Sequence, residues 1–121
     1  MNDEKTEQLK RRTKRFGLRS IRLIKALPEG KIADVLGRQL LRSATSVGAN
    51  YRSALRGRST AEFLSRLGVV EEEIDESLYW LVMLVEAGLV GQQRLAALMK
   101  EANEIASIIV SAIKTTRRRH K

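Results

Sequence analysis

Residues 43–60 read SATSVGANYRSALRGRST, and the first half of this stretch carries small side chains where a buried helix face normally carries large ones. The apolar positions keep a helical spacing, so we interpret Ser43 to Ala49 as the interior of a helix. Small side chains there let a neighbouring helix backbone approach closely. Asn50 shares a face with Val47 and Ala54, which predicts a buried amide that ties neighbouring helices or subunits together.

The hydrophobic periodicity of the whole chain predicts four helices joined by short connections. Apolar side chains recur at steps of three and four residues, and the expected helices span about residues 6–26, 31–55, 60–87 and 92–115. Short connections make successive helices antiparallel neighbours. We therefore expect a single-domain, all-α, up-down-up-down antiparallel four-helix bundle over residues 1–115, followed by a basic flexible tail over residues 116–121.

Turn and cap residues mark the ends of these helices. Pro28 and Gly30 interrupt the pattern after the first helix. Ser59 and Glu62 have the spacing of a capping box, in which each side chain accepts a hydrogen bond from a backbone N–H at the start of a helix. Gly88 follows the third helix, where a left-handed residue costs glycine nothing, and this predicts a C-terminal cap.

The third expected helix carries more apolar surface than one bundle interior needs. Its last turns, Tyr79 to Val90, read YWLVMLVEAGLV, and a helix that is apolar on several faces is buried on several faces. Trp80 and Leu84 fall together, away from the expected inner stripe, which consists of Phe63, Leu67, Val70, Ile74, Leu78, Leu81 and Val85. We therefore predict that Tyr79, Trp80 and Leu84 pack against another subunit. The alternative is that Trp80 packs under the following turn.

The net charge of +9 is unevenly distributed. Residues 1–27 hold nine Lys or Arg and three Asp or Glu, whereas residues 114–121 hold five Lys or Arg and no acidic residue. The positive charge therefore lies on the first helix and on the C-terminal tail. Such asymmetry favours a polyanionic partner, nucleic acid first and an anionic membrane surface second, beside the alternative of a solvated surface without a partner.

Basic residues are the candidates for nucleic-acid contact, and the expected mechanism is neutralisation of phosphates. They occupy one side of the first helix, the turn after the second helix and the tail: Arg11, Arg15, Arg19, Arg22, Lys25, Arg56, Arg58, Arg117, Arg118 and Arg119. Few aromatic side chains are available to stack on bases, so we expect weak sequence preference and a steep dependence on salt.

The residues needed for catalysis or metal binding form no known pattern. The chain has no cysteine and a single histidine, His120, so neither a nucleophile–base pair nor the Glu-x-x-His ligands of a di-iron bundle can form. Arg56-Gly57-Arg58 matches no phosphate-loop pattern. The acidic run from Glu71 to Glu76 lacks ligands from a second element and is better explained as a partner for arginines. We therefore predict that the protein is not an enzyme and holds no metal or cofactor.

Two consecutive helices carry a resemblance to a known family. The segment from Gln39 to Val90 resembles the four-helix bundle proteins encoded within intervening sequences of bacterial 23S ribosomal RNA genes. The matching positions are Gln39, Leu40, Arg42, Ser43, Ser46, Val47, Asn50, Arg56, Arg58, Phe63, Glu72, Glu76 and Trp80. One departure follows Asn50, because many members continue with Ile-Ala-Glu-Gly whereas this chain continues with Tyr-Arg-Ser-Ala.

The resemblance implies an up-down four-helix bundle that assembles into a ring-shaped homopentamer and has no known enzymatic activity. It also implies nucleic-acid binding as the suspected role. The accessory variability determinant proteins of diversity-generating retroelements are a related group of basic pentamers, which bind a reverse transcriptase and nucleic acid. That parallel is one of fold alone.

Three functions follow from the charge pattern and the resemblance together. The first is a homo-oligomeric, non-enzymatic protein that binds RNA or DNA. The second is a structural or adaptor ring that docks an acidic protein partner such as a nucleic-acid enzyme. The third, attachment to a membrane surface, is disfavoured because the core uses the apolar face of the first helix. The longest apolar stretch, residues 78–90, is too short to cross a bilayer, and the charged N-terminus and absent cysteines fit a cytoplasmic protein.

Overall fold

The computed structural model describes residues 3–120, and this part of the chain contains four helices and no β-strand. The helices are α1 (Asp3–Lys25), α2 (Lys31–Leu55), α3 (Thr60–Glu86) and α4 (Gln92–Arg119). The prediction of a single all-α domain with four helices is confirmed. The expected bounds agree to within a few residues except at the end of α4. The prediction that this helix stops at residue 115 is wrong, because arginines are good helix formers and their charge suits a helix C-terminus.

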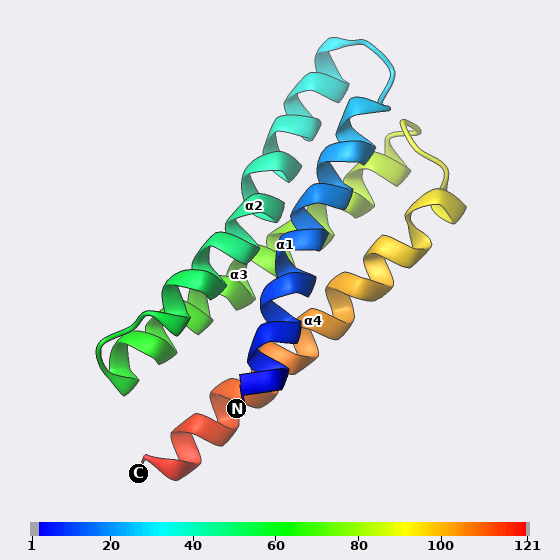
Figure 1. Cartoon of the computed structure of the whole chain (residues 1–121). Coiled ribbons are helices and arrows are strands. Elements are labelled where there is room, and N and C mark those ends of the chain that lie inside the picture. The colour runs from blue at the N-terminus through cyan, green and yellow to red at the C-terminus, as the bar shows by residue number, and fades with distance from the viewer. Residues whose placement is uncertain (1–2, 121) are drawn as a thin grey trace.

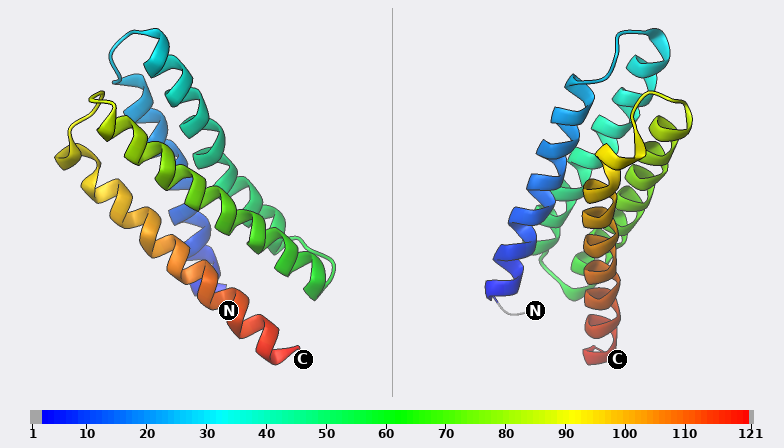
Figure 2. Two further views of the ribbon diagram at one scale, coloured as in Figure 1. Left: turned by 180° about the vertical axis from the view of Figure 1, so that it is seen from behind. Right: turned by 90° about the vertical axis from the view of Figure 1, so that its right-hand side faces the viewer.

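Each helix packs along its neighbours in the chain. The contacts join α1 to α2, α2 to α3 and α3 to α4, and a looser seam joins α1 to α4 (Figure 1). The connections after α1 and after α3 lie at one end of the molecule. The connection after α2 lies at the other end, together with both chain termini (Figures 1 and 2). Segments from all four helices therefore meet at this second end.

The core consists of the apolar stripes that face the common interior. In α1 and α4 the buried side chains recur at steps of three and four residues, as expected, because periodicity determines which side of an amphipathic helix is buried. They include Leu9, Phe16 and Leu23 in α1, and Leu95, Leu98, Ala102, Ile105, Ile109 and Ile113 in α4. The large fully buried side chains are Phe16, Leu40, Val47, Tyr51, Leu67, Val70, Ile74, Leu81, Leu84, Leu95, Ile105 and Ile109.

The predicted caps form at the start and at the end of α3. The Ser59 hydroxyl accepts a hydrogen bond from the backbone N–H of Glu62 (3.1 Å), and the Glu62 carboxylate accepts one from the backbone N–H of Arg58 (3.0 Å). At the end of α3, Gly88 has a φ of 77°, and the N–H of Leu89 donates to the carbonyl of Leu84 (3.0 Å). Together with the bond from the N–H of Gly88 to the carbonyl of Val85 (3.0 Å), this bond forms a Schellman motif, in which the left-handed residue is most easily glycine.

The small residues of α2 permit a backbone-to-backbone contact with α1. A methyl group placed on Gly48 would lie 3.3 Å from backbone atoms of Thr13 and Lys14. One placed on Gly17 of α1 would lie 3.5 Å from the carbonyl oxygen of Ala44. The prediction that Ser43 to Ala49 is helix interior that lets a neighbouring helix approach closely is confirmed.

Asn50 does not have the environment predicted for it. It is half-buried, and its Nδ2 donates to the carbonyl oxygen of Ser46 (2.9 Å) in its own helix, so the prediction of a buried amide that links neighbouring helices is wrong within the chain. The buried position belongs to the next residue, Tyr51, because the core side of α2 is centred on Leu40 and Val47. Burial raises the pKa of the Tyr51 hydroxyl to about 12, although an interaction with Thr6 opposes this shift.

Leu84 is fully buried in the core of its own chain, so the prediction that it faces another subunit is wrong. The core side of α3 carries Ser77, Leu81 and Leu84, whereas Leu78 is only half-buried. The last turns of α3 are apolar nearly all round, so periodicity could not determine which way the helix is rotated. Inside the bundle the Ser77 hydroxyl lies 3.0 Å from that of Ser43, and this pair turns the Ser77 side toward α2.

Candidate nucleic-acid interface

A row of positive charge lies along the outer side of α1. Arg11, Arg15 and Arg22 are spaced by whole helical turns and are exposed, as is Lys25, while Arg19 is half-buried. No described carboxylate lies within ion-pair distance of any of these five side chains. The row therefore makes no ion pair that stabilises the fold, and its charges are accessible from solvent.

Another basic residue of α1, Arg12, connects this helix to α4. Its guanidinium donates to both carboxylate oxygens of Glu101 (2.6 and 3.0 Å) and to Glu104 (3.1 Å). The hydrogen bond from Arg12 lowers the pKa of the Glu101 carboxyl, with smaller contributions from the nearby charges of Arg19 and Arg15. The α1–α4 seam is thus held by a partly buried ion cluster that the sequence did not reveal.

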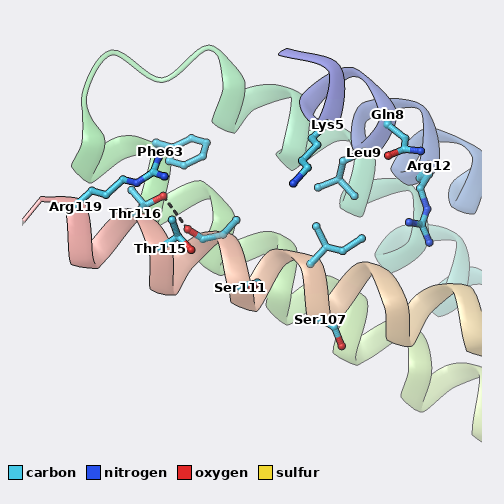
Figure 3. A pocket seen from close by; sticks show the side chains of 12 residues that line it. Lys5, Gln8, Leu9, Arg12, Phe63, Ser107, Ser111, Thr115, Thr116 and Arg119 are labelled. Carbon is cyan, nitrogen blue, oxygen red and sulfur yellow. Dashed lines mark hydrogen bonds between the residues drawn. The ribbon is translucent and has the colours of Figure 1, made fainter. Parts of the chain in front are cut away.

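A groove of about 900 Å³ follows the α1–α4 seam toward the chain termini (Figure 3). Leu9, Phe63 and Ile108 give it apolar walls, and α4 lines it with hydroxyl groups. Three cations also line it: Lys5 and Arg12 of α1 and Arg119 of α4. The groove therefore brings one predicted contact residue, Arg119, beside the first turns of α1, although more than a hundred residues separate them in the sequence.

The remaining predicted contact residues gather at the same end of the molecule. Arg117, Arg118 and Arg119 are exposed on the last turn of α4, which extends past the start of α1 (Figure 2). Arg56 and Arg58 are exposed in the connection between α2 and α3, which lies at this end as well (Figure 1). The basic turn and the basic C-terminus, distant in sequence, are brought to one end by the short connections between helices.

A second cationic groove, of about 400 Å³, lies on the outer side of the α1–α2 seam. It is lined by Lys10 and Lys14 of α1, by Arg52 of α2, and by the small residues at which the two helices touch. Leu18 and Ile21 of α1 give it an apolar wall. Residues 3–120 place no carboxylate within ion-pair distance of these three cations. These three residues are not among the candidate contacts named from the sequence, although Lys10 and Lys14 are spaced by one helical turn.

The acidic run of α3 has a partner at the α2–α3 seam. Arg42 donates to the carboxylate of Glu76 and lies 3.4 Å from that of Glu73. The hydrogen bond from Arg42 lowers the pKa of the Glu76 carboxyl, which also accepts a longer hydrogen bond from the indole N–H of Trp80 (3.4 Å). Part of the acidic run thus serves an ion pair within the chain.

Apolar side chains remain exposed on α2 and α3. Tyr79 is 57 % exposed and stands edge-to-face on the half-buried ring of Trp80, with ring centroids 5.0 Å apart. On α2, Ile32 and Val35 are 65 % and 49 % exposed. Large apolar side chains gathered on a protein surface commonly mark a contact with another protein.

Among residues 3–120 no three His, Cys, Asp or Glu side chains lie close enough together to hold a metal ion. No described helix combines the length and the apolar character that crossing a bilayer requires.

Comparison with known proteins gives a family match and a structural match. Residues 5–111 match the family described as 23S rRNA-intervening sequence protein. A crystal structure of a protein of unknown function from the S23 ribosomal protein family of Bacteroides thetaiotaomicron is similar to this chain, with a TM-score of 0.85 and 31 % sequence identity. The similarity covers 91 % of this chain and 98 % of that one. No curated protein matches the chain.

Proposed function

This chain belongs to the 23S rRNA-intervening sequence protein family, and from that premise we propose that it is a non-enzymatic, homo-oligomeric protein that binds nucleic acid through its basic surfaces. Phosphate contacts would supply the affinity, and sequence specificity would be low. The observation that carries this proposal is the outer row on α1, where Arg11, Arg15 and Arg22 are exposed and unpaired.

The pairing of charges elsewhere supports the proposal. Arg12 and Arg42 make ion pairs with carboxylates across helix seams, so arginines of this protein do stabilise the fold where acidic partners stand opposite them. The outer row makes no such ion pair among the described residues, since Glu101 acts on Arg15 and Arg19 only from beyond ion-pair distance. The row leaves like charges next to one another, which costs stability unless a polyanion neutralises them. An exposed row of arginines suits the regularly spaced phosphates of RNA or DNA, and contacts with phosphates carry no sequence information.

We further infer that the four helices form an up-down-up-down antiparallel bundle that acts as one subunit of a ring, a pentamer by resemblance. Tyr79, Trp80, Ile32 and Val35 are the apolar residues that a neighbouring subunit would cover. Repetition of the basic row around a ring would multiply the phosphate contacts made by one assembly. The double variant Val35→Glu/Tyr79→Glu should then lower the solution mass measured by light scattering to that of one chain. A mass as large as that of the Asn103→Glu control would contradict this arrangement.

Binding measured against salt tests the nucleic-acid proposal. A labelled RNA or DNA oligonucleotide is titrated with protein at salt concentrations between about 50 and 200 mM, a range over which a protein with several phosphate contacts loses orders of magnitude in affinity. The wild-type plot of log K against log salt should be steep. In the triple variant Arg11→Glu/Arg15→Glu/Arg22→Glu, the slope should be shallower by about three for each subunit that touches the strand.

Two outcomes would contradict the proposal. A flat plot for the wild-type protein would show that phosphate neutralisation contributes nothing. An unchanged slope in the triple variant would remove the outer row from the interface. If instead the protein co-purifies with an acidic protein after nuclease treatment and the triple variant loses that partner, the basic row belongs to an adaptor ring.

A further inference from the structure

The three cations of the α1–α2 groove stand apart from the other interhelical charges of this protein. Arg12 faces two carboxylates across the α1–α4 seam, and Arg42 faces two across the α2–α3 seam. Lys10, Lys14 and Arg52 also lie at a seam, yet no carboxylate of the described chain lies within ion-pair distance of them. Three positive charges around one groove repel one another, and no negative charge of the described chain offsets this repulsion.

The form of the groove follows from the backbone contact beneath it. Gly17 and Gly48 bring α1 and α2 together, and with Ala49 they form a floor of small residues, beside which Leu18 and Ile21 of α1 give the groove an apolar wall. Lys10 and Lys14 lie one turn apart on one side of this floor, and Arg52 approaches from the other side. A small anion on the floor would therefore be reached from both helices, by two ammonium groups and a guanidinium.

We infer that the α1–α2 groove, lined by Lys10, Lys14 and Arg52, is a phosphate-binding site that holds a phosphate of the nucleic-acid backbone. A guanidinium matches the oxygens of a phosphate in a bidentate manner, while lysine ammonium groups contact it as point charges. The volume of about 400 Å³ accommodates a phosphate with its sugar. This inference rests on the proposed function, because it specifies where on the molecule the strand is held.

The groove is continuous with the outer basic row. Lys14 is the direct neighbour of Arg15 in the sequence and lies one turn from Arg11, so the charges run around α1 from its outer side to the seam with α2. A strand that crosses the outer row can therefore enter the groove without leaving positive potential. The outer row supplies contacts on an open surface, whereas the groove holds one phosphate from two helices.

The experiment compares two double variants that remove the same amount of charge. Lys14→Gln/Arg52→Gln empties the groove of two cations. Arg38→Gln/Arg66→Gln removes two exposed arginines, each without an ion pair within residues 3–120. Affinity for a labelled single-stranded RNA oligonucleotide is measured against salt. We expect the groove variant to have a slope shallower by about one to two and an affinity lower by about tenfold or more, while the control stays close to wild type.

A second measurement identifies the bound group. Inorganic phosphate, compared with chloride at equal ionic strength, should raise the melting temperature of the wild-type protein and of the control, and should raise that of the groove variant less. Poly-glutamate that competes with RNA as well as a polyphosphate does would overturn the inference, because the groove would then hold carboxylates. Phosphatidylserine vesicles that bind in a groove-dependent way while RNA binding does not depend on the groove would overturn it in favour of a lipid.

The outcomes separate this inference from the proposed function. If the outer-row variant Arg11→Glu/Arg15→Glu/Arg22→Glu loses RNA and the groove variant binds like its control, nucleic-acid binding stands and the phosphate site is wrong. If both variants bind like the wild type, the proposed function fails and the inference fails with it. A shallower salt slope in both variants, with the control unchanged, supports both.

Discussion

On one side of α1 the helix meets α4 through the ion cluster of Arg12, and on its other side it meets α2 through backbone contact at Gly17 and Gly48. The first seam depends on a charged side chain that reaches carboxylates of the opposite helix. The second depends on the absence of side chains, because the two backbones are in direct van der Waals contact and no side chain has to bridge them. One side of α1 thus packs through ion pairs and the other through backbone contact.

The difference explains which charges are free for binding. At the α1–α4 seam, Arg12 is already hydrogen-bonded to Glu101 and Glu104, so an incoming phosphate would have to displace carboxylates. At the α1–α2 seam the packing requires no charge. Lys14 and Arg52 line the groove there and make no ion pair with the described residues that stabilises the fold. Packing by shape therefore leaves polar side chains available for function, whereas packing by ion pairs uses them.

The largest expected effect comes from disrupting the backbone contact. Gly48→Leu places a branched side chain where even a methyl group would lie 3.3 Å from backbone atoms of Thr13 and Lys14, so α1 and α2 must separate. We expect the free energy of unfolding to fall by about 3 kcal/mol, as for strong overpacking, and the midpoint of a urea unfolding curve measures it.

Gly68→Leu is the matched control for that substitution. Gly68 is also in the middle of a helix, but a methyl group placed on it meets no atom within 4 Å. Its replacement should therefore be neutral or stabilising by up to about 1 kcal/mol, since leucine favours the helix over glycine. Equal effects at the two positions would show that the α1–α2 seam does not depend on close approach.

Much of the fold could be predicted because its signals are local. The caps at Ser59 and Gly88 and the stripes of α1 and α4 follow from spacing along the chain, and the structure confirms them. The close contact beside Gly48 was also predictable, since small residues on the buried side of a helix let a neighbouring helix approach closely. The rotation of α3 was not, because its last turns are apolar on several sides and only contacts with α2, such as that between Ser77 and Ser43, determine it.

The candidate site was less predictable, for a physical reason. Periodicity correctly placed Arg11, Arg15 and Arg22 on one exposed side of α1. It could not indicate that Arg12 is paired, because Glu101 lies 89 residues away in the sequence. The α1–α2 groove likewise combines residues of two helices, and no pattern within one helix reveals which cations face each other across a seam. Whether a charge is paired is a tertiary property.

A medium effect is expected at the α1–α4 seam and depends on pH. Arg12 holds the pKa of Glu101 below its ordinary value of 4.5, so the pair contributes stability above that pH and loses it as the pH falls through the lowered value. Glu101→Gln should cost about 1 kcal/mol at neutral pH, and its difference from wild type should close in acid. Urea unfolding at several pH values measures this.

The α1–α2 seam provides the contrast for that measurement. Lys14→Gln also removes one charge, but Lys14 has no carboxylate partner among the described residues. Its unfolding free energy should stay within about 0.5 kcal/mol of wild type, and that difference should not change between neutral and acidic pH. An acid-dependent loss in Lys14→Gln would mean that this seam too is held by an ion pair.

The smallest effect on stability comes from giving the α1–α2 seam the carboxylate that it lacks. Ala49 is exposed and lies in the groove among Lys10, Lys14 and Arg52, so Ala49→Glu should raise the unfolding free energy by up to about 0.5 kcal/mol. The same carboxylate should occupy the place of a phosphate, so the affinity for RNA should fall and the salt slope should become shallower. Ala96→Glu is the control, because it adds the same charge four residues before Lys100 on α4, where a pair of ordinary helical spacing can form. Unchanged RNA affinity in a stable Ala49→Glu protein would mean that the unpaired cations of this seam contact no phosphate. A loss of affinity in Ala49→Glu but not in Ala96→Glu would show that stability and binding compete for the same three side chains.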